Sequence, residues 1–123
     1  MSKKILLIED SRPLGSLLRE VLKRSGYSVT FFTSIKEALS KMKEGKFGLV
    51  LIEYGLSKEP VLEAISKLKE IDREIKIVLL ADDFLKDDFT LEELRADRAL
   101  FKPFTNQQFL AMVEEVFSKN KKS

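Results

Sequence analysis

The sequence predicts an α/β domain built on a doubly wound parallel sheet of five strands with five helices. Five short apolar runs alternate along the chain with segments whose apolar residues recur at helical spacing. The third run, residues 48–56, reads GLVLIEYGL, and its first residues are apolar on both faces. Such a strand belongs in the middle of a parallel sheet that helices cover on each side. Right-handed crossovers then favour the flavodoxin-like strand order 2-1-3-4-5.

The first half of the chain carries clear start and stop signals. A strand is expected over residues 4–8, and the helix after it begins near Pro13, because proline is tolerated in the first helical turn. Gly26 is placed to end that helix. A second strand is expected over residues 28–32, and the helix that follows it ends at Gly45.

The second half repeats this alternation around the central strand, which ends on Glu53. The next helix begins near Pro60, and a fourth strand is expected over residues 75–80. A short fifth strand over residues 98–101 precedes the last helix, which Thr105 opens as an N-cap.

The fourth helix has the weakest pattern. Six carboxylates and one lysine lie between Asp82 and Glu93, which gives little apolar periodicity. Thr90 and Glu93 form a capping box that would start a helix late. We therefore expect a long connection and a short helix that ends near Arg95.

Length and composition set limits on function. The chain of 123 residues is long enough for one domain, expected over residues 1–119, with residues 120–123 as a frayed polar tail. A net charge of +2 gives no reason to expect nucleic-acid binding. Cysteine and histidine are both absent, which excludes thiolate metal sites and histidine-based catalysis, so an enzyme is not expected. The first residues form neither a signal peptide nor a membrane span, and a cytoplasmic protein is expected.

Charged residues follow several of the predicted strands. Glu9 and Asp10 follow the first, Glu53 ends the third, and Lys102 follows the fifth, while the uncharged Ala81 follows the fourth. Ligands of open α/β sheets bind outside the carboxyl ends of the strands. We therefore expect these residues to line one small cleft.

The cleft has the residues for a weak metal site. Glu9, Asp10, Glu53 and the backbone carbonyl of Gly55 could supply hard oxygen ligands to Mg²⁺. Without a cation the carboxylates repel one another, and Lys102 offsets only one charge. In the metal-free protein we expect Lys102 to bridge Glu53 and Asp10 directly.

Four segments together resemble the receiver domain of response regulators in two-component signalling: ILLIEDS, FGLVLIEYG, IVLLAD and LFKPF. The resemblance spans essentially the whole chain. It implies a bacterial signalling protein in which the acidic pair holds Mg²⁺, an aspartate that ends the third strand accepts a phosphoryl group, and Lys102 pairs with the phosphate. It also implies a cis Lys102–Pro103 bond. The implied partner is a kinase or an output protein, which would bind the face formed by helix four, strand five and helix five. The chain itself is expected to be a monomer or weak dimer that binds neither nucleic acid nor a membrane.

The sequence departs from the family pattern at several positions. Glu53 replaces the phosphoacceptor aspartate, Ala81 replaces a hydroxyl residue, and Ala99 replaces an aromatic residue. The loop at Leu56–Ser57 lacks a Met-Pro pair, and Arg95 replaces a glycine. These replacements favour a pseudo-receiver, an interaction module that works without phosphorylation.

Two other interpretations stay open. The domain could still accept phosphate, or Glu53 could mimic phosphoaspartate and hold it constitutively active. A flavodoxin-like binder of a small molecule is less favoured, because no glycine-rich phosphate loop follows the first strand.

Overall fold

The computed structural model describes residues 3–55 and 58–121, with side chains described to residue 118. Leu56 and Ser57, where the sequence lacks the Met-Pro pair, lie outside the described residues, as do residues 122–123 of the predicted tail. No helix among the residues described is both long and apolar enough to cross a membrane.

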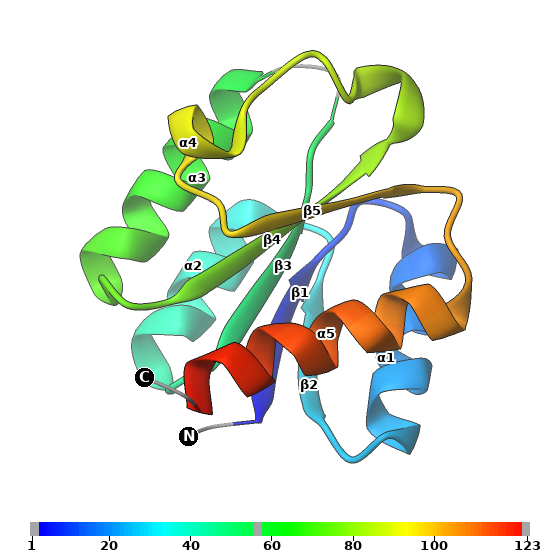
Figure 1. The fold of residues 1–123 in the computed structure, drawn as a ribbon. Coiled ribbons are helices and arrows are strands. Elements are labelled where there is room, and N and C mark those ends of the chain that lie inside the picture. Colours follow the sequence, from blue (N-terminus) through cyan, green and yellow to red (C-terminus); the bar gives the residue numbers. More distant parts are fainter. Residues whose placement is uncertain (1–2, 56–57, 122–123) are drawn as a thin grey trace.

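The described chain alternates strands and helices as predicted (Figure 1). In order, the elements are β1 (Lys4–Ile8), α1 (Arg12–Arg24), β2 (Ser28–Phe32), α2 (Ile35–Glu44), β3 (Leu49–Glu53), α3 (Lys58–Ile71), β4 (Lys76–Asp82), the 3₁₀ turn η1 (Asp83–Leu85), α4 (Leu91–Leu94), β5 (Arg98–Lys102) and α5 (Asn106–Lys121). The fourth strand runs farther than predicted, because Asp82 still pairs with Lys102 of β5.

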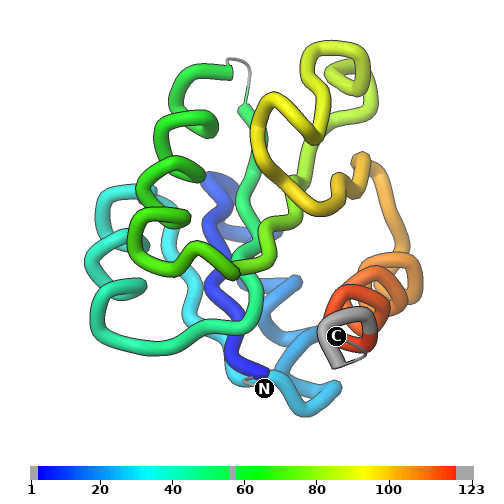
Figure 2. Tube along the Cα trace, turned by 60° about the vertical axis from the view of Figure 1, so that its left-hand side comes forward, coloured from blue at the N-terminus to red at the C-terminus, as the bar shows by residue number. Residues whose placement is uncertain are grey.

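The strands form one parallel sheet in the order β2-β1-β3-β4-β5, which confirms the predicted topology. Helices α1 and α5 cover one face, and α2, α3 and α4 cover the other (Figures 1 and 2). All strands therefore end at the same edge of the sheet, at the top of Figure 1.

Each face of the sheet has its own apolar core. Along β1, Ile5 and Leu7 join the core under α1 and α5, whereas Leu6 and Ile8 join the core under α2 and α3. All four side chains are buried, and β3 and β4 show the same pattern. This confirms that the central strands are apolar on both faces, and the alternation decides which side chains share a face where the strands end.

A glycine lets α1 approach the sheet closely. Gly15 is buried in α1, and a Cβ atom at that position would lie 2.1 Å from Cζ of Phe31 on β2. The Phe31 ring thus lies directly on the helix backbone. The Phe31 ring also contacts Arg19, whose guanidinium lies 5.8 Å from the ring centroid in a cation–π geometry.

The segment between β4 and β5 contains the 3₁₀ turn η1 and one short α-helix, α4, which ends next to Arg95 as the sequence predicted. Both hydrogen bonds of the Thr90–Glu93 capping box are present. Arg95 ends the helix with φ of 60°, a left-handed conformation that favours glycine. Glu93 also forms a 3.1 Å ion pair with Lys58, which joins this segment to the start of α3.

Candidate functional site

An ion-pair network joins the ends of three strands. The Nζ atom of Lys102 lies 2.8 Å from Oε2 of Glu53 and 3.2 Å from Oε1 of Glu9. Alternation along β1, β3 and β5 places all three residues on the face that carries α1 and α5. The peptide bond after the lysine, Lys102–Pro103, is cis, as the family resemblance implied.

Glu9, rather than Asp10, is the second partner of Lys102, so the expected Lys102–Asp10 bridge is wrong. Glu9 is fully buried, and its second carboxylate oxygen accepts a 3.1 Å hydrogen bond from the Ser11 backbone N–H. Asp10 is exposed and belongs by alternation to the opposite face. Its backbone N–H, however, donates a 3.3 Å hydrogen bond to Oε1 of Glu53.

The site carries more negative than positive charge, since three carboxylates lie close together and the one ammonium group pairs with only two of them. The hydrogen bond with Glu53, together with burial and the charge of Glu53, raises the pKa of Asp10. Burial by itself would lower the pKa of Lys102, but the hydrogen bond to Glu53 and the charges of Glu9 and Glu53 outweigh it and raise that pKa. The ammonium group is thus held in its charged form.

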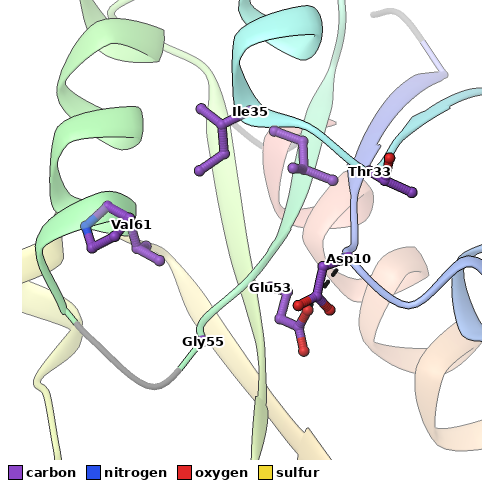
Figure 3. Close-up of a pocket in the computed structure, with 8 residues that line it drawn as sticks. Asp10, Thr33, Ile35, Glu53, Gly55 and Val61 are labelled. Atoms are coloured by element: carbon purple, nitrogen blue, oxygen red, sulfur yellow. Dashed lines mark hydrogen bonds between the residues drawn. The ribbon is translucent and has the colours of Figure 1, made fainter.

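A cavity of about 350 Å³ opens beside this network on the α2–α3 side (Figure 3). Asp10 and Glu53 lie together at one side of it, and Gly55 follows on the chain. The cavity is lined by Ile8, Asp10, Thr33, Ile35, Glu53, Gly55, Pro60 and Val61. Apolar side chains therefore form most of the wall opposite the two carboxylates.

Three of the four predicted metal ligands, the carboxylates, come together. One oxygen from each of Glu9, Asp10 and Glu53 lies within 4.8 Å of the others. Carboxylate oxygens are the ligands that Mg²⁺ prefers, so the donor set fits this ion. Lys102 competes with a cation for Glu9 and Glu53, whereas exposed Asp10 makes no ion pair with any cation that the structure describes.

The two alanines of the predicted pocket lie in a different environment. Ala81 is fully buried in the core under α2 and α3, and Ala99 packs against the same core. Their methyl groups can neither donate nor accept a hydrogen bond. Of the predicted pocket residues, the structure therefore brings Glu53 and Lys102 into polar contact and leaves Ala81 and Ala99 as packing residues.

Sequence reasoning missed Tyr54, the residue directly after Glu53. Its side chain is 1% exposed, and its hydroxyl donates a 2.5 Å hydrogen bond to Asp88 in the segment after β4. Its ring lies 4.6 Å from the ring of Phe89. Burial and the bond to Asp88 raise the pKa of Tyr54. A buried tyrosine hydroxyl needs a partner, so the residue type was a signal, although the sequence could not name the partner.

Comparison with known proteins identifies the family. The family model described as the response regulator receiver domain matches residues 5–114. The uncharacterized transcriptional regulatory protein YkoG of Bacillus subtilis is 31% identical over 117 residues, which cover 94% of this chain and 51% of that protein. The alkaline phosphatase synthesis transcriptional regulatory protein PhoP of Bacillus subtilis is 31% identical over 121 residues, 98% of this chain and 50% of that protein. The chain thus spans about half the length of the curated relatives it matches.

Solved structures agree with this assignment. A CheY-like receiver domain protein from Methanospirillum hungatei superposes with a TM-score of 0.81 at 21% identity and full coverage of both chains. The response regulator protein TrrA from Thermotoga maritima, solved in complex with Mg(2+)-BeF, has a TM-score of 0.78 at 25% identity, with 94% of this chain and 99% of that chain covered. The chain belongs to the response regulator receiver domain family of two-component signalling.

Proposed function

We propose that this receiver domain is a pseudo-receiver, a non-enzymatic interaction module that works in cytoplasmic signalling without phosphorylation. In this proposal Glu53 stands where the family has its phosphoacceptor aspartate. The observation that carries it is that both carboxylate oxygens of Glu53 are engaged, Oε2 by Lys102 and Oε1 by the backbone N–H of Asp10. A carboxylate held in this way is poorly placed to attack a phosphorus atom.

The length of the side chain also works against phosphoryl transfer. Glutamate carries one more methylene than aspartate, which moves its carboxylate by about 1.5 Å. A misplacement of that order can cost roughly 10²-fold in rate. Phosphoryl transfer depends almost entirely on positioning and charge stabilisation, so little else in the site can compensate.

The residues at the ends of β4 and β5 support the same interpretation. A ligand shifts a conformational equilibrium only when some group binds it differently in the two states. Ala81 is buried and has no hydroxyl to move toward a phosphoryl group, and Ala99 has no ring to reorient. Lys102 is then the one residue of the predicted pocket that can respond to a change at Glu53.

A second candidate, constitutive activity by mimicry, is favoured by the 2.8 Å contact between Lys102 and Glu53. Glu53 supplies a charge of about −1 at this point, against −1.5 to −2 for a phosphate group. Amide resonances of Glu53→Gln separate the two candidates. The pseudo-receiver gives changes confined to the neighbours of residue 53, whereas mimicry gives changes that extend along β4 and β5.

A divalent cation is part of the proposal in a minor role. Glu9, Asp10, Glu53 and the carbonyl of Gly55 would hold Mg²⁺ weakly, and the ion would neutralise excess negative charge at the site. Millimolar Mg²⁺ should then raise the melting temperature of the wild type, because an ion that binds only the folded state stabilises it. Asp10→Asn should abolish this increase, and an equal increase in that variant would contradict the assignment.

The direct test of the pseudo-receiver is intact-mass analysis after incubation with acetyl phosphate and Mg²⁺. The wild type should gain no adduct of about 80 Da, the mass of one phosphoryl group. Glu53→Asp is the matched variant that shortens the acceptor, and Glu53→Asp with Ala81→Thr also supplies a hydroxyl. We expect the adduct in the double variant, and rapid stoichiometric labelling of the wild type that Glu53→Gln abolishes would overturn the proposal.

A further inference from the structure

One phenylalanine lies on the surface while the others are buried or half-buried. Phe84 is 74% exposed, the highest value among the exposed large apolar side chains in the described part of the chain. It belongs to η1, directly after β4, in the coil that projects beyond the strand ends at the top of Figure 2. Single exposed apolar side chains are common on protein surfaces, so the case for an interaction site depends on how this ring is held and on the charges around it.

The turn that carries Phe84 is anchored to the core by neighbouring apolar side chains. The next residue, Leu85, and Phe89 are 9% and 8% exposed and pack in the core under α2 and α3. Backbone hydrogen bonds of 3.1 Å from Lys86 to Asp83 and of 2.9 Å from Asp88 to Leu85 close the turn. The exposed ring is therefore presented by an ordered backbone.

Tyr54 adds a link between this turn and the candidate site. Its buried hydroxyl holds the side chain of Asp88 at 2.5 Å, and its backbone N–H bonds the Leu80 carbonyl of β4 at 2.8 Å. These contacts need no phosphoryl group and no movement of Ala81. The contacts that hold the turn are thus formed while Glu53 carries no phosphoryl group.

The surroundings of Phe84 are acidic. Asp83 and Asp87 flank it within the same turn, both are exposed, and neither forms a salt bridge with a cation among the residues described. Lys86 is the one cation between β4 and Thr90. A partner that covers Phe84 must therefore also place positive charge near Asp83 and Asp87.

The partner face that the family resemblance implied exposes less of its large apolar side chains than the turn after β4 does. Helix α4 has four residues, and its most exposed large apolar side chain, Leu91, is 36% exposed. The side chains of β5 are all half-buried. Phe84 is therefore more exposed than any large apolar side chain that the structure describes on α4, β5 or α5.

We infer that Asp83, Phe84 and Asp87, the Phe84 surface, dock a protein segment that carries an apolar side chain flanked by lysine or arginine. Aromatic side chains in a fixed position dominate binding energy at interfaces. Opposite charge around such an anchor supplies orientation and speeds association. The inference rests on the proposed function, because the surface is presented without phosphorylation.

The test is selection from a phage-displayed library of random linear peptides against the wild-type chain. Enriched peptides are then measured by fluorescence anisotropy against wild type, Phe84→Ala, Asp83→Asn with Asp87→Asn, and Leu17→Ala. The last is the matched control, because Leu17 is 51% exposed on α1, away from η1. Melting temperatures verify that each variant is folded.

Enriched peptides should pair basic residues with an apolar one. Phe84→Ala should weaken their binding about tenfold or more. The double asparagine variant should weaken it and remove most of its salt dependence, while Leu17→Ala should leave it unchanged. Peptides that bind Phe84→Ala as well as wild type, acidic peptides, or no enrichment would overturn the inference. So would a wild-type dimer in sedimentation that Phe84→Ala abolishes, since the occupant would then be a second copy.

Two further measurements separate this inference from the proposed function. Tyr54→Phe tests the positioning link, and it should weaken peptide binding less than Phe84→Ala does and lower the protection of the η1 amides from hydrogen exchange. Repeating the affinity measurement with acetyl phosphate and Mg²⁺ should change nothing. Binding that requires acetyl phosphate would refute the pseudo-receiver while keeping the surface, whereas phosphate-independent binding elsewhere would refute the surface alone.

Discussion

Replacing Lys102 by methionine removes the one ammonium group of the site while keeping most of the aliphatic volume. The change leaves Glu9 fully buried and Glu53 17% exposed without their shared cation. Glu9 would keep the hydrogen bond from the Ser11 backbone N–H but lose its cation. We expect Lys102→Met to be among the more destabilising single substitutions near this site.

The magnitude follows from the two distances. At an effective dielectric constant of about 20, unit charges 2.8 and 3.2 Å apart attract by about 5–6 kcal/mol per pair. Desolvation of the buried groups cancels much of this attraction, and removal of one partner from a buried pair typically costs about 3–5 kcal/mol. Because the lysine side chain is 17% exposed and water can reach the gap, we expect a loss of about 3 kcal/mol in the free energy of unfolding.

Urea denaturation followed by circular dichroism measures this loss. With an m value of about 2 kcal/mol per molar, the midpoint should fall by about 1.5 M. Glu9→Gln with Lys102→Met should regain part of the stability, because the buried charge is removed along with its partner. A Lys102→Met variant within about 1 kcal/mol of wild type would refute the reasoning. So would a double variant no more stable than Lys102→Met alone.

Three other predictions concern the backbone, packing and pH. Arg95→Gly should raise the unfolding free energy by about 0.5–1 kcal/mol, because Arg95 has φ of 60° and glycine adopts this conformation without strain; Arg95→Ala, measured alongside, should give no gain. Gly15→Ala should lower stability by about 1–3 kcal/mol, since its Cβ would meet the Phe31 ring, and Phe31→Leu in the same chain should recover part of the loss. Because burial raises the pKa of Tyr27 and of Tyr54 above the ordinary value of a tyrosine, about 10, their contribution to stability is present below pH 10 and is lost as the pH rises above it. Tyr54→Phe should flatten that alkaline loss in denaturation curves, and an unchanged slope would contradict it.

Much of the fold could be predicted because its signals are local. A run that is apolar on both faces, such as residues 49–52, has few places other than the centre of a covered parallel sheet. Thr90 and Glu93 marked the start of α4, and the lack of apolar periodicity before them indicated its short length. The convergence of Glu53 and Lys102 followed from topology alone.

The parts that could not be predicted depend on side-chain direction and on contacts distant in sequence. The choice between Glu9 and Asp10 was accessible in principle, because alternation along β1 puts Glu9 on the face of Lys102, but it requires the last strand residue to be known. The bond from Tyr54 to Asp88 joins residues 34 apart through a segment without regular structure. The contact of Gly15 with Phe31 depends on the distance between α1 and the sheet, and no local sequence pattern predicts that distance.

The stretch between β4 and β5 owes its shape to a few inward-pointing side chains, among them Leu85, Phe89 and Leu94, and not to a long helix. Its outward positions, including Asp83, Phe84 and Asp87, contribute little to folding, and surface substitutions of this kind usually change stability by less than about 0.5 kcal/mol. Selection can therefore alter these positions freely while the scaffold stays intact. A lineage that kept this scaffold could acquire a new binding specificity through a handful of codons.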